Sequence, residues 1–353
     1  MRVQGETPKF IMTSLYSHLP RNYTHQRSHP RPQRTREEEE ARERRRQIAE
    51  ETLRDIGNGY YYTEDGTKYG FVETQQYGQA NTIYVAPDDK DIKRWRNPTR
   101  PIRYPFDPPV PATVSIVLSS TLKAIHYLNC PNVGVLNFAN AIQPGGGFVS
   151  GAEAQEEHLA RSSNLHTMLT SNEGTEFYVH HLNTETDGFN THAMIYAPVV
   201  IFIRDDSGRL VPPSKASVIT CAAVNRAEVR KHFQEGPEVE AEVESTMRER
   251  MGRILRLFEE CGDRHLILGS FGTGVFQNSV SMIAKIWADL LVGDNARFNK
   301  SFEQVIFAIK DPVTFEEFKK EFGRRVVTVP VPDQEIIGKK QDGTGLSVGH
   351  SSH

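Results

Sequence analysis

The chain has 353 residues, of which 37% are hydrophobic and 25% are charged, enough for one large domain or two ordinary ones. Its formal net charge of −3 and isoelectric point near 6.5 argue against a dedicated duplex-binding protein, although a cradle of backbone amides still allows a nucleotide or polymer ligand. The mean hydropathy of −0.52 indicates that part of the length does not fold.

Three cysteines, Cys130, Cys221 and Cys261, are too few and too widely spaced for a disulfide framework or a zinc site. Cys130 and Cys221 lie in or beside apolar runs, so both are predicted to be ordinary buried thiols. The first residues include no long apolar stretch, and no window approaches the roughly 18 apolar residues of a membrane span. These features predict an intracellular protein of the cytoplasm, the nucleus or both.

The first part of the chain has little apolar periodicity. Residues 1–33 are rich in Pro, Arg, His, Ser and Thr and are predicted to form a disordered extension. Residues 34–56 mix both charge signs around Ile48, Leu53 and Ile56, which predicts a solvated helix that docks one narrow apolar stripe. A basic cluster in this helix would suit a nuclear signal, but a charged helix face is the commoner meaning.

Residues 60–111 combine aromatics with several Pro and Gly and include a short strand-like piece at 82–86. We assign residues 34–111 to an accessory helix and loop layer on the main domain. Trp95 and Tyr104 stand here among Lys and Arg residues, a composition that suits contact with a polyanionic chain. The alternative is a solvated loop that packs its aromatics inward.

From residue 112 onward, short apolar strands alternate with amphipathic helices. The predicted strands are 113–119, 132–139, 194–204, 217–224, 265–268 and 305–309, and the predicted helices are 121–129, 155–169, 239–258, 280–291 and a last one striped by Phe315, Phe318 and Phe322. Such alternation predicts an α/β domain whose sheet is covered on both faces. The domain is predicted to span 112–330 and to be followed by a flexible tail at 331–353.

Two of these strands end in glycine-rich loops, QPGGGFVSG after 132–139 and GSFGTGVFQN after 265–268. Glycines let backbone N–H groups approach an anion closely, and the helix that follows adds a favourable dipole. Ligands of open α/β sheets bind beyond the carboxyl ends of the strands, where both loops fall. Neither loop has the Gly-Lys-Ser/Thr of a Walker loop or the acidic partner of a dinucleotide fingerprint, so a kinase or a dehydrogenase is disfavoured.

Gln155, Glu156 and Glu157 come shortly after the first loop. Successive helical residues point about 100° apart, so one carboxylate can face a scissile bond while the other binds a neighbouring hydroxyl. Adjacent like charges also raise at least one pKa, which suits a general acid at neutral pH. Alternatively, both acids only complement the helix dipole, although Ser150 and Glu153 already fit a capping box.

The spacing of Gly145-Gly146-Gly147 from Gln155-Glu156-Glu157 resembles the signature of poly(ADP-ribose) glycohydrolases, and NFANAIQPGGGFVSGAEAQEEHLARSSNL is similar to the microbial-type branch. The later GSFGTGVFQN resembles that family's diphosphate-binding loop, and the match runs from about residue 113 to 309. The resemblance implies a macrodomain-like three-layer α/β/α sandwich with a mixed central sheet and an N-terminal helical extension. It also implies hydrolysis of the ribose–ribose O-glycosidic bonds of poly(ADP-ribose), with no metal or redox cofactor.

The resemblance further implies a role for each matching residue. Glu157 would be the general acid that protonates the departing ribose 2′ oxygen and then takes a proton from the attacking water. Glu156 would hold a ribose hydroxyl, and Gln155 would set the geometry of the loop. Phe148 would either line the site or brace the loop. The other implied substrate contacts are Asn140, Gly145, Gly146, Gly147, Gly272, Thr273, Gly274, Val275 and Phe276.

The implied partners are poly(ADP-ribose), poly-ADP-ribosylated proteins and the product ADP-ribose, as in de-ADP-ribosylation during a DNA damage response. Neither a membrane nor sequence-specific nucleic-acid binding is expected. Two alternatives stay open: a reader that binds ADP-ribose without turnover, and a hydrolase of single ADP-ribose units on proteins. A reader has no need of the Glu156–Glu157 pair. A metal-dependent nucleotide diphosphate hydrolase is rejected, because it needs several carboxylates on one helix face.

Several other polar residues need no site to explain them. His180 and His181 are predicted to be loop or surface residues, and His158 an exposed helical residue. Asp205 and Asp206 belong to a segment with the composition of a turn.

Overall fold

The computed structural model describes residues 35–97 and 110–324, in two units, Met1–Glu39 and Glu40–His353. The predicted extension at 1–33, Tyr104 and the predicted tail at 331–353 lie outside the described residues. No helix in the described ranges is both long and apolar enough to cross a membrane.

The described part of the first unit is the first turn of a helix, which Thr35 and Glu38 cap reciprocally. The Thr35 amide donates to the Glu38 carboxylate at 2.8 Å, and Thr35 Oγ1 accepts from the Glu38 amide at 3.2 Å. The capping box predicted at Ser150 and Glu153 is wrong, because the helix after them begins only at Gln155 and has no side-chain cap.

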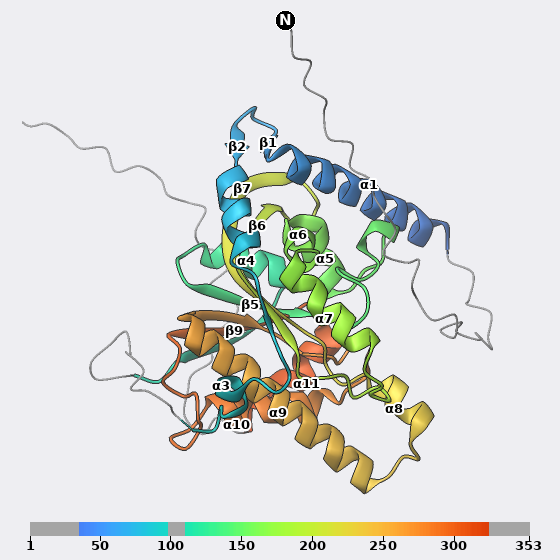
Figure 1. Ribbon diagram of the computed structural model, residues 1–353, viewed down its shortest axis with the longest axis vertical. Coiled ribbons are helices and arrows are strands. Elements are labelled where there is room, and N and C mark those ends of the chain that lie inside the picture. The colour runs from blue at the N-terminus through green and yellow to red at the C-terminus, as the bar shows by residue number, and fades with distance from the viewer. Residues whose placement is uncertain (1–34, 98–109, 325–353) are drawn as a thin grey trace, which may run out of the picture. The chain divides into compact units, whose positions relative to one another are not determined.

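The described elements follow one another along the chain (Figure 1). Their bounds are α1 (Arg36–Asn58), β1 (Tyr60–Tyr62), β2 (Lys68–Gly70), α2 (Val72–Ala80), β3 (Ile83–Val85), α3 (Lys90–Lys93), β4 (Thr113–Leu118), α4 (Thr121–Leu128), β5 (Val133–Phe138), η2 (Phe148–Ser150), α5 (Gln155–Ser162), α6 (Leu165–Leu169), α7 (Asn172–Leu182), β6 (Met194–Arg204), β7 (Leu210–Cys221), α8 (Arg226–His232), α9 (Pro237–Cys261), β8 (His265–Leu268), α10 (Val280–Leu291), β9 (Gln304–Ile309) and α11 (Pro312–Gly323).

Within the described ranges, seven strands form one mixed sheet in the order β3-β6-β7-β5-β8-β9-β4. The strands from β7 to β4 pair in parallel, whereas β6 is antiparallel to both β7 and β3. The edge strand β3 comes from the segment that the sequence assigns to the accessory layer. Because β5, β8, β9 and β4 run in the same direction, their carboxyl ends meet at one edge of the sheet, where the two glycine loops begin.

Helices cover both faces of the sheet, as predicted. Leu136 of β5 packs with α9, α10 and α11, whereas its neighbours Val133 and Val135 pack with α4, α6 and α7. This alternation is the two-residue period of a strand with both faces buried. Figure 1 shows the orange and red helices on one side of the sheet and the green helices on the other. The result is a three-layer α/β/α sandwich.

Helix α1 docks one narrow stripe, but not the predicted one. The stripe consists of Ala49, Thr52 and Ile56, which are fully or almost fully buried, while Leu53 is 37% exposed and Ile48 only partly buried. A small and a polar residue take the central positions because Thr52 Oγ1 donates to the backbone carbonyl of Arg161 at 2.8 Å. The prediction of a helix is confirmed, and Ile56 belongs to the docked stripe as predicted. Ala49 and Thr52 take the places predicted for Ile48 and Leu53.

The strand predicted at 194–204 has those bounds as β6, while the strand predicted at 217–224 starts earlier and ends earlier, as β7. Helix α7 was not predicted. It carries His180 and His181, so their assignment to a loop is wrong, and His181 is buried at 7% exposure. The apolar pattern of the sequence does not reveal α7, because polar residues occupy much of this helix. Of the two thiols predicted to be buried, Cys221 is, whereas Cys130 is only partly buried.

Candidate functional site

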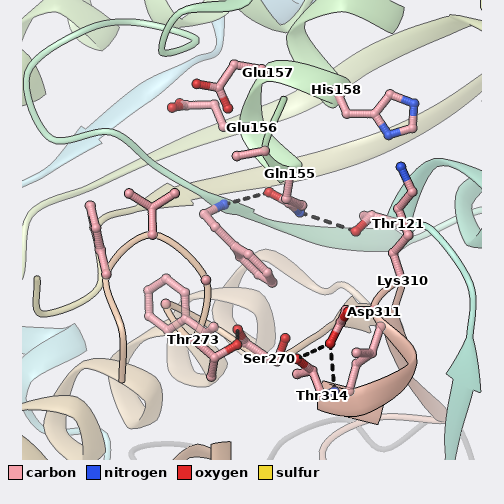
Figure 2. A pocket seen from close by; sticks show the side chains of 18 of the residues that line it. Thr121, Gln155, Glu156, Glu157, His158, Ser270, Thr273, Lys310, Asp311 and Thr314 are labelled. Atoms are coloured by element: carbon pink, nitrogen blue, oxygen red, sulfur yellow. Dashed lines mark hydrogen bonds between the residues drawn. The ribbon is translucent and has the colours of Figure 1, made fainter. Parts of the chain in front are cut away.

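A cavity of about 540 Å³ opens at the carboxyl ends of the parallel strands. Its walls are the ends of β4, β5 and β9, the start of α5, and the loop after β8. It is large enough for a dinucleotide-sized ligand, since small-molecule pockets run from about 300 to 1,000 Å³. Figure 2 shows the side chains of α5 facing those of the β8 and β9 loops across it.

Gln155 fixes the start of α5 to the end of β5. Its Oε1 accepts from the Phe138 amide at 2.8 Å, and its Nε2 donates to the Leu136 carbonyl at 2.8 Å. The same Nε2 reaches Thr121 Oγ1 at 3.4 Å (Figure 2). One side chain therefore continues the pairing of β5 where the strand ends, and sets the direction in which the next two residues point.

Glu156 lies beneath the cavity, with 2% of its surface exposed. Its Oε2 accepts from the Asn140 amide at 2.7 Å and its Oε1 from Asn137 Nδ2 at 3.1 Å. Burial, with a smaller contribution from the charge of the neighbouring Glu157, raises the pKa of Glu156 to about 8 against the lowering effect of these two donors. Glu156 thus braces the turn after β5, and a carboxyl with this pKa exchanges its proton near neutral pH.

Glu157 is half-buried and lines the cavity. The Gly147 amide donates to its Oε1 at 3.1 Å, while no described residue donates to its second oxygen. Gly146 has a left-handed φ of 56°, and a Cβ there would come within 2.3 Å of Glu157 Oε1. The first glycine loop therefore holds one oxygen of this cavity-lining carboxylate and leaves the other without a donor among the described residues.

Phe148 braces the first loop and does not line the cavity. It is 1% exposed and packs with Ala49 of α1 and Ala160 of α5. Its ring also lies 5.1 Å from that of His166. The alternative that Phe148 lines the site is therefore not what the structure shows, and Gly145, Gly146 and Gly147 also stand outside the cavity wall.

The second glycine loop forms the opposite wall. Gly272 has a φ of 75°, and a Cβ there would lie 2.5 Å from Ala223 Cβ, so both the backbone angle and the space require glycine. Gly274 has open space around its Cα, which leaves its backbone accessible to a ligand. Val275 is 76% exposed at the rim. Phe276 is partly buried and packs against the core.

Asn278 supports this loop from below, and the sequence did not single it out. Its buried Nδ2 donates to the Gly272 carbonyl at 3.0 Å and to the Val224 carbonyl at 2.7 Å. It therefore ties the glycine loop to the segment that follows β7. The only sequence signal is its place at the end of GSFGTGVFQN.

The third wall is polar and was missed as a site. His158 faces Asp206, with 3.6 Å between the imidazole and the carboxylate, and Ser120 Oγ donates to Asp206 at 2.7 Å. Lys310 reaches Glu153 at 3.1 Å. His158 is therefore a half-buried cavity residue, not the exposed residue predicted, and burial lowers its pKa while Asp206 opposes that shift.

The predicted residues divide clearly between cavity wall and support. The cavity wall includes Asn140, Gln155, Glu156, Glu157, Gly272, Thr273, Gly274, Val275 and Phe276. Asp205 forms the turn after β6 with Ser207 and Arg209, as its sequence context predicted. Trp95 is 4% exposed and stacks on Phe298, so this aromatic packs inward. Among the described residues, no group of three or more His, Cys, Asp or Glu side chains could hold a metal ion.

Comparisons with known proteins agree on one family. The family model "Microbial-type PARG, catalytic domain" matches residues 49–205, a range that includes the first loop and Gln155-Glu156-Glu157. A comparison with curated proteins finds no match.

Among solved structures, this chain is similar to poly(ADP-ribose) glycohydrolase from Thermomonospora curvata, at 30% identity and a TM-score of 0.71, over 80% of this chain and 99% of that chain. The same enzyme bound to the inhibitor ADP-HPD is similar at 31% identity and a TM-score of 0.69, with the same coverage. The enzyme from Deinococcus radiodurans in complex with ADP-ribose is similar at 31% identity and a TM-score of 0.63, over 71% of this chain and 97% of that chain.

Proposed function

This chain belongs to the microbial-type poly(ADP-ribose) glycohydrolase family, and we propose that it hydrolyses the ribose–ribose bonds of poly(ADP-ribose) with Glu157 as general acid and base. The observation that carries the role of Glu157 is its position: its carboxylate lines the cavity, and one of its oxygens is held by the Gly147 amide. Glycoside cleavage needs a proton donor on the leaving oxygen, and a carboxyl group held in this way can supply one.

In the proposed reaction the terminal ADP-ribose occupies the cavity. Its diphosphate lies on the backbone of Gly272 to Phe276, and its distal ribose lies between Phe276 and Asn140. Glu157 protonates the 2′ oxygen of the departing ribose, and the bond to the anomeric carbon breaks as an oxocarbenium-like state develops. Water then attacks that carbon, and the Glu157 carboxylate takes the water's proton, which returns the enzyme to its starting state.

Glu156 has a different role in this scheme. Its oxygens are engaged by Asn140 and Asn137, so it is not free to act as a second acid at the leaving oxygen. It fixes the Asn140 backbone and holds a ribose hydroxyl at the reacting end. Gln155 acts only through position, because both ends of its amide are bonded to β5.

The test uses the full chain and ADP-ribose polymer in excess chelator, with free ADP-ribose followed over time. We expect release by the wild type and at least about a 1,000-fold slower rate for Glu157→Gln, since removing an acid catalyst costs about 10²–10⁴-fold or more. Both proteins should bind ADP-ribose equally well within a factor of about three. Glu173→Gln, an exposed first-turn glutamate on α7, is the matched control and should keep full activity.

Other results would assign the site differently. Binding of ADP-ribose without release by the wild type, with or without chelator, would mean that the chain is a reader. Full release by Glu157→Gln would remove that residue from the mechanism. Release by the wild type that occurs without chelator and is lost in it would indicate a metal-dependent reaction.

The wider setting is proposed on the same basis. Poly-ADP-ribosylated proteins are the physiological substrates, and the reaction removes polymer from them, as in a DNA damage response. Product analysis on polymer and on proteins that carry a single ADP-ribose unit separates this activity from that of a mono-ADP-ribosyl hydrolase. We expect release from the polymer and retention of the last, protein-linked unit.

A further inference from the structure

Arg250 of α9 is a buried cation that, among the described residues, bonds only to backbone carbonyls. Its side chain is 1% exposed. Nη1 donates to the Ala222 carbonyl at 3.0 Å, and Nη2 donates to the carbonyls of Phe189 at 2.9 Å and Asn190 at 3.2 Å. Its Nε has no acceptor among the described residues. A buried charge is costly without a partner of opposite charge, so this arrangement calls for a function.

No carboxylate of the described residues forms an ion pair with Arg250, in contrast to its neighbours on the same helix. Arg253 pairs with Glu249 at 2.8 Å, and Arg256 pairs with Glu259 at 2.9 Å. Burial lowers the pKa of Arg250 to about 10, so the guanidinium is still charged at neutral pH. The titratable group with the largest electrostatic effect on Arg250 is the Cys221 thiol. Burial raises the pKa of this thiol to about 12, so the thiol is neutral at neutral pH.

The position of this charge is directly behind the second glycine loop. Ala222, which accepts from Arg250, precedes Ala223, and Ala223 lines the cavity and abuts Gly272. Asn190, which also accepts from Arg250, donates through its Nδ2 to the Ala223 carbonyl at 2.7 Å. The guanidinium is thus separated from the cavity by about one peptide unit and one hydrogen bond, roughly 7 Å in all.

We propose that Arg250 is an internal counter-charge for the substrate diphosphate, which increases affinity for anionic ligands through the cavity wall without touching them. The inference rests on the proposed function, since it requires the diphosphate to lie on the Gly272–Phe276 loop. That loop offers amides but no cation of its own. A cation in the dry wall behind it acts through a medium that water and salt screen weakly, so its field reaches the ligand.

The experiment compares two ligands that share an adenosine group and differ in charge. ADP-ribose carries the diphosphate, and adenosine carries no phosphate. Affinities for both are measured by calorimetry for the wild type, Arg250→Met and Arg250→Lys. Arg253→Met is the matched control, because it removes a buried guanidinium of α9 that already has a carboxylate partner.

We expect Arg250→Met to weaken ADP-ribose binding about tenfold or more, a change of about 1.4 kcal/mol, and to leave adenosine binding within a factor of about two. Arg250→Lys should recover most of the loss, because it keeps the charge but not the fork of donors. Arg253→Met should leave the ratio of the two affinities unchanged. If Arg250→Met does not fold, Arg250→Gln takes its place, since it removes the charge but keeps a donor for the Ala222 carbonyl.

Two results would overturn the proposal. An equal loss for ADP-ribose and adenosine would mean that Arg250 only supports the wall, and an unchanged ADP-ribose affinity would mean that its charge does not reach the ligand. Both leave the proposed function intact. Failure of the wild type to bind ADP-ribose would contradict the proposed function itself, and the wild-type measurement alone reveals it.

Discussion

A Cβ atom on Gly146 would lie 2.3 Å from Oε1 of Glu157, so the middle glycine of the first loop and the proposed acid compete for the same space. The carboxylate occupies the position that any other residue at 146 would need for its side chain. Glycine is therefore required at position 146 for two reasons: its φ of 56° favours glycine, and a side chain there would collide with the Glu157 carboxylate.

Gly146→Ala should lower the turnover number about 100-fold, because displacement of a catalytic group by about 1 Å has an effect of that size. The left-handed backbone should also cost about 1–2 kcal/mol of folding free energy. Gly66→Ala is the control: Gly66 has a φ of 81° with nothing within 4 Å of the added Cβ. It should show the stability loss without the catalytic loss. Similar turnover numbers for both variants would show that the Glu157 carboxylate keeps its catalytic position beside a methyl group at position 146.

Glu156 should make stability depend on pH. Burial raises its pKa from 4.5 to about 8, so the folded state holds one more proton than the unfolded state between these values. This contribution to the free energy of unfolding is complete below about pH 4.5 and is lost as the pH rises toward 8.

Glu156→Gln removes that proton, so denaturant unfolding from pH 5 to 8 should show a shallower decline, by up to about 1.4 kcal/mol per pH unit. The amide can be accommodated because Asn137 has an unused buried Oδ1 and can turn to accept from it. Identical pH profiles for the variant and the wild type would indicate that Glu156 is ionised throughout this range.

Gln155→Glu should damage the junction of β5 and α5. The new carboxylate still accepts from the Phe138 amide, but it cannot donate to the Leu136 carbonyl, which it would repel. We expect a loss of about 1–3 kcal/mol in the free energy of unfolding, and a lower turnover number because Glu157 is displaced with the helix. Gln143→Glu, at an exposed position of the neighbouring loop, should change neither quantity measurably.

Asn278→Asp should weaken ADP-ribose binding at least about tenfold. The substitution removes both donors that hold Gly272 and Val224, and it adds a buried negative charge beneath the proposed diphosphate site. Asn299→Asp offers a close comparison, because Asn299 Nδ2 also donates to two backbone carbonyls, but Asn299 is only partly buried and lies outside the loop. Affinities for ADP-ribose are measured by calorimetric titration, and equal affinities of the two variants would contradict the supporting role of Asn278.

Most strands of the seven-stranded sheet were predictable from the sequence, although β7 begins earlier than predicted, and the walls of the site were predictable only in part. β6 is a continuous apolar run that ends at a turn, so its bounds follow from composition alone. The two glycine loops and α5 follow from strand ends and glycine spacing, since these are local signals. His158 and Lys310 come from distant segments, and only the sheet order brings them to one wall of the cavity.

The errors have the same origin. Ser150 and Glu153 have the spacing of a capping box, yet Ser150 Oγ donates to the Gly147 carbonyl and Glu153 pairs with Arg45 and Lys310. Tertiary partners thus outcompeted the local hydrogen bonds that the pattern predicts. Arg250 shows the converse case, because no local pattern in the sequence indicates that this arginine of α9 is buried.

The contacts of α1 with the active-site segment join parts of the chain that are made at different times. Arg42 donates to Ser150, Arg45 donates to the Gly151 carbonyl, and Thr52 donates to the Arg161 carbonyl, each across more than 100 residues. During synthesis α1 emerges first and has no docking surface until α5 follows. The highly charged sequence of α1 suits a helix that is exposed to water until it docks, and the first glycine loop is held by contacts of high sequence separation, which form only after the entropic cost of closing a long loop is met.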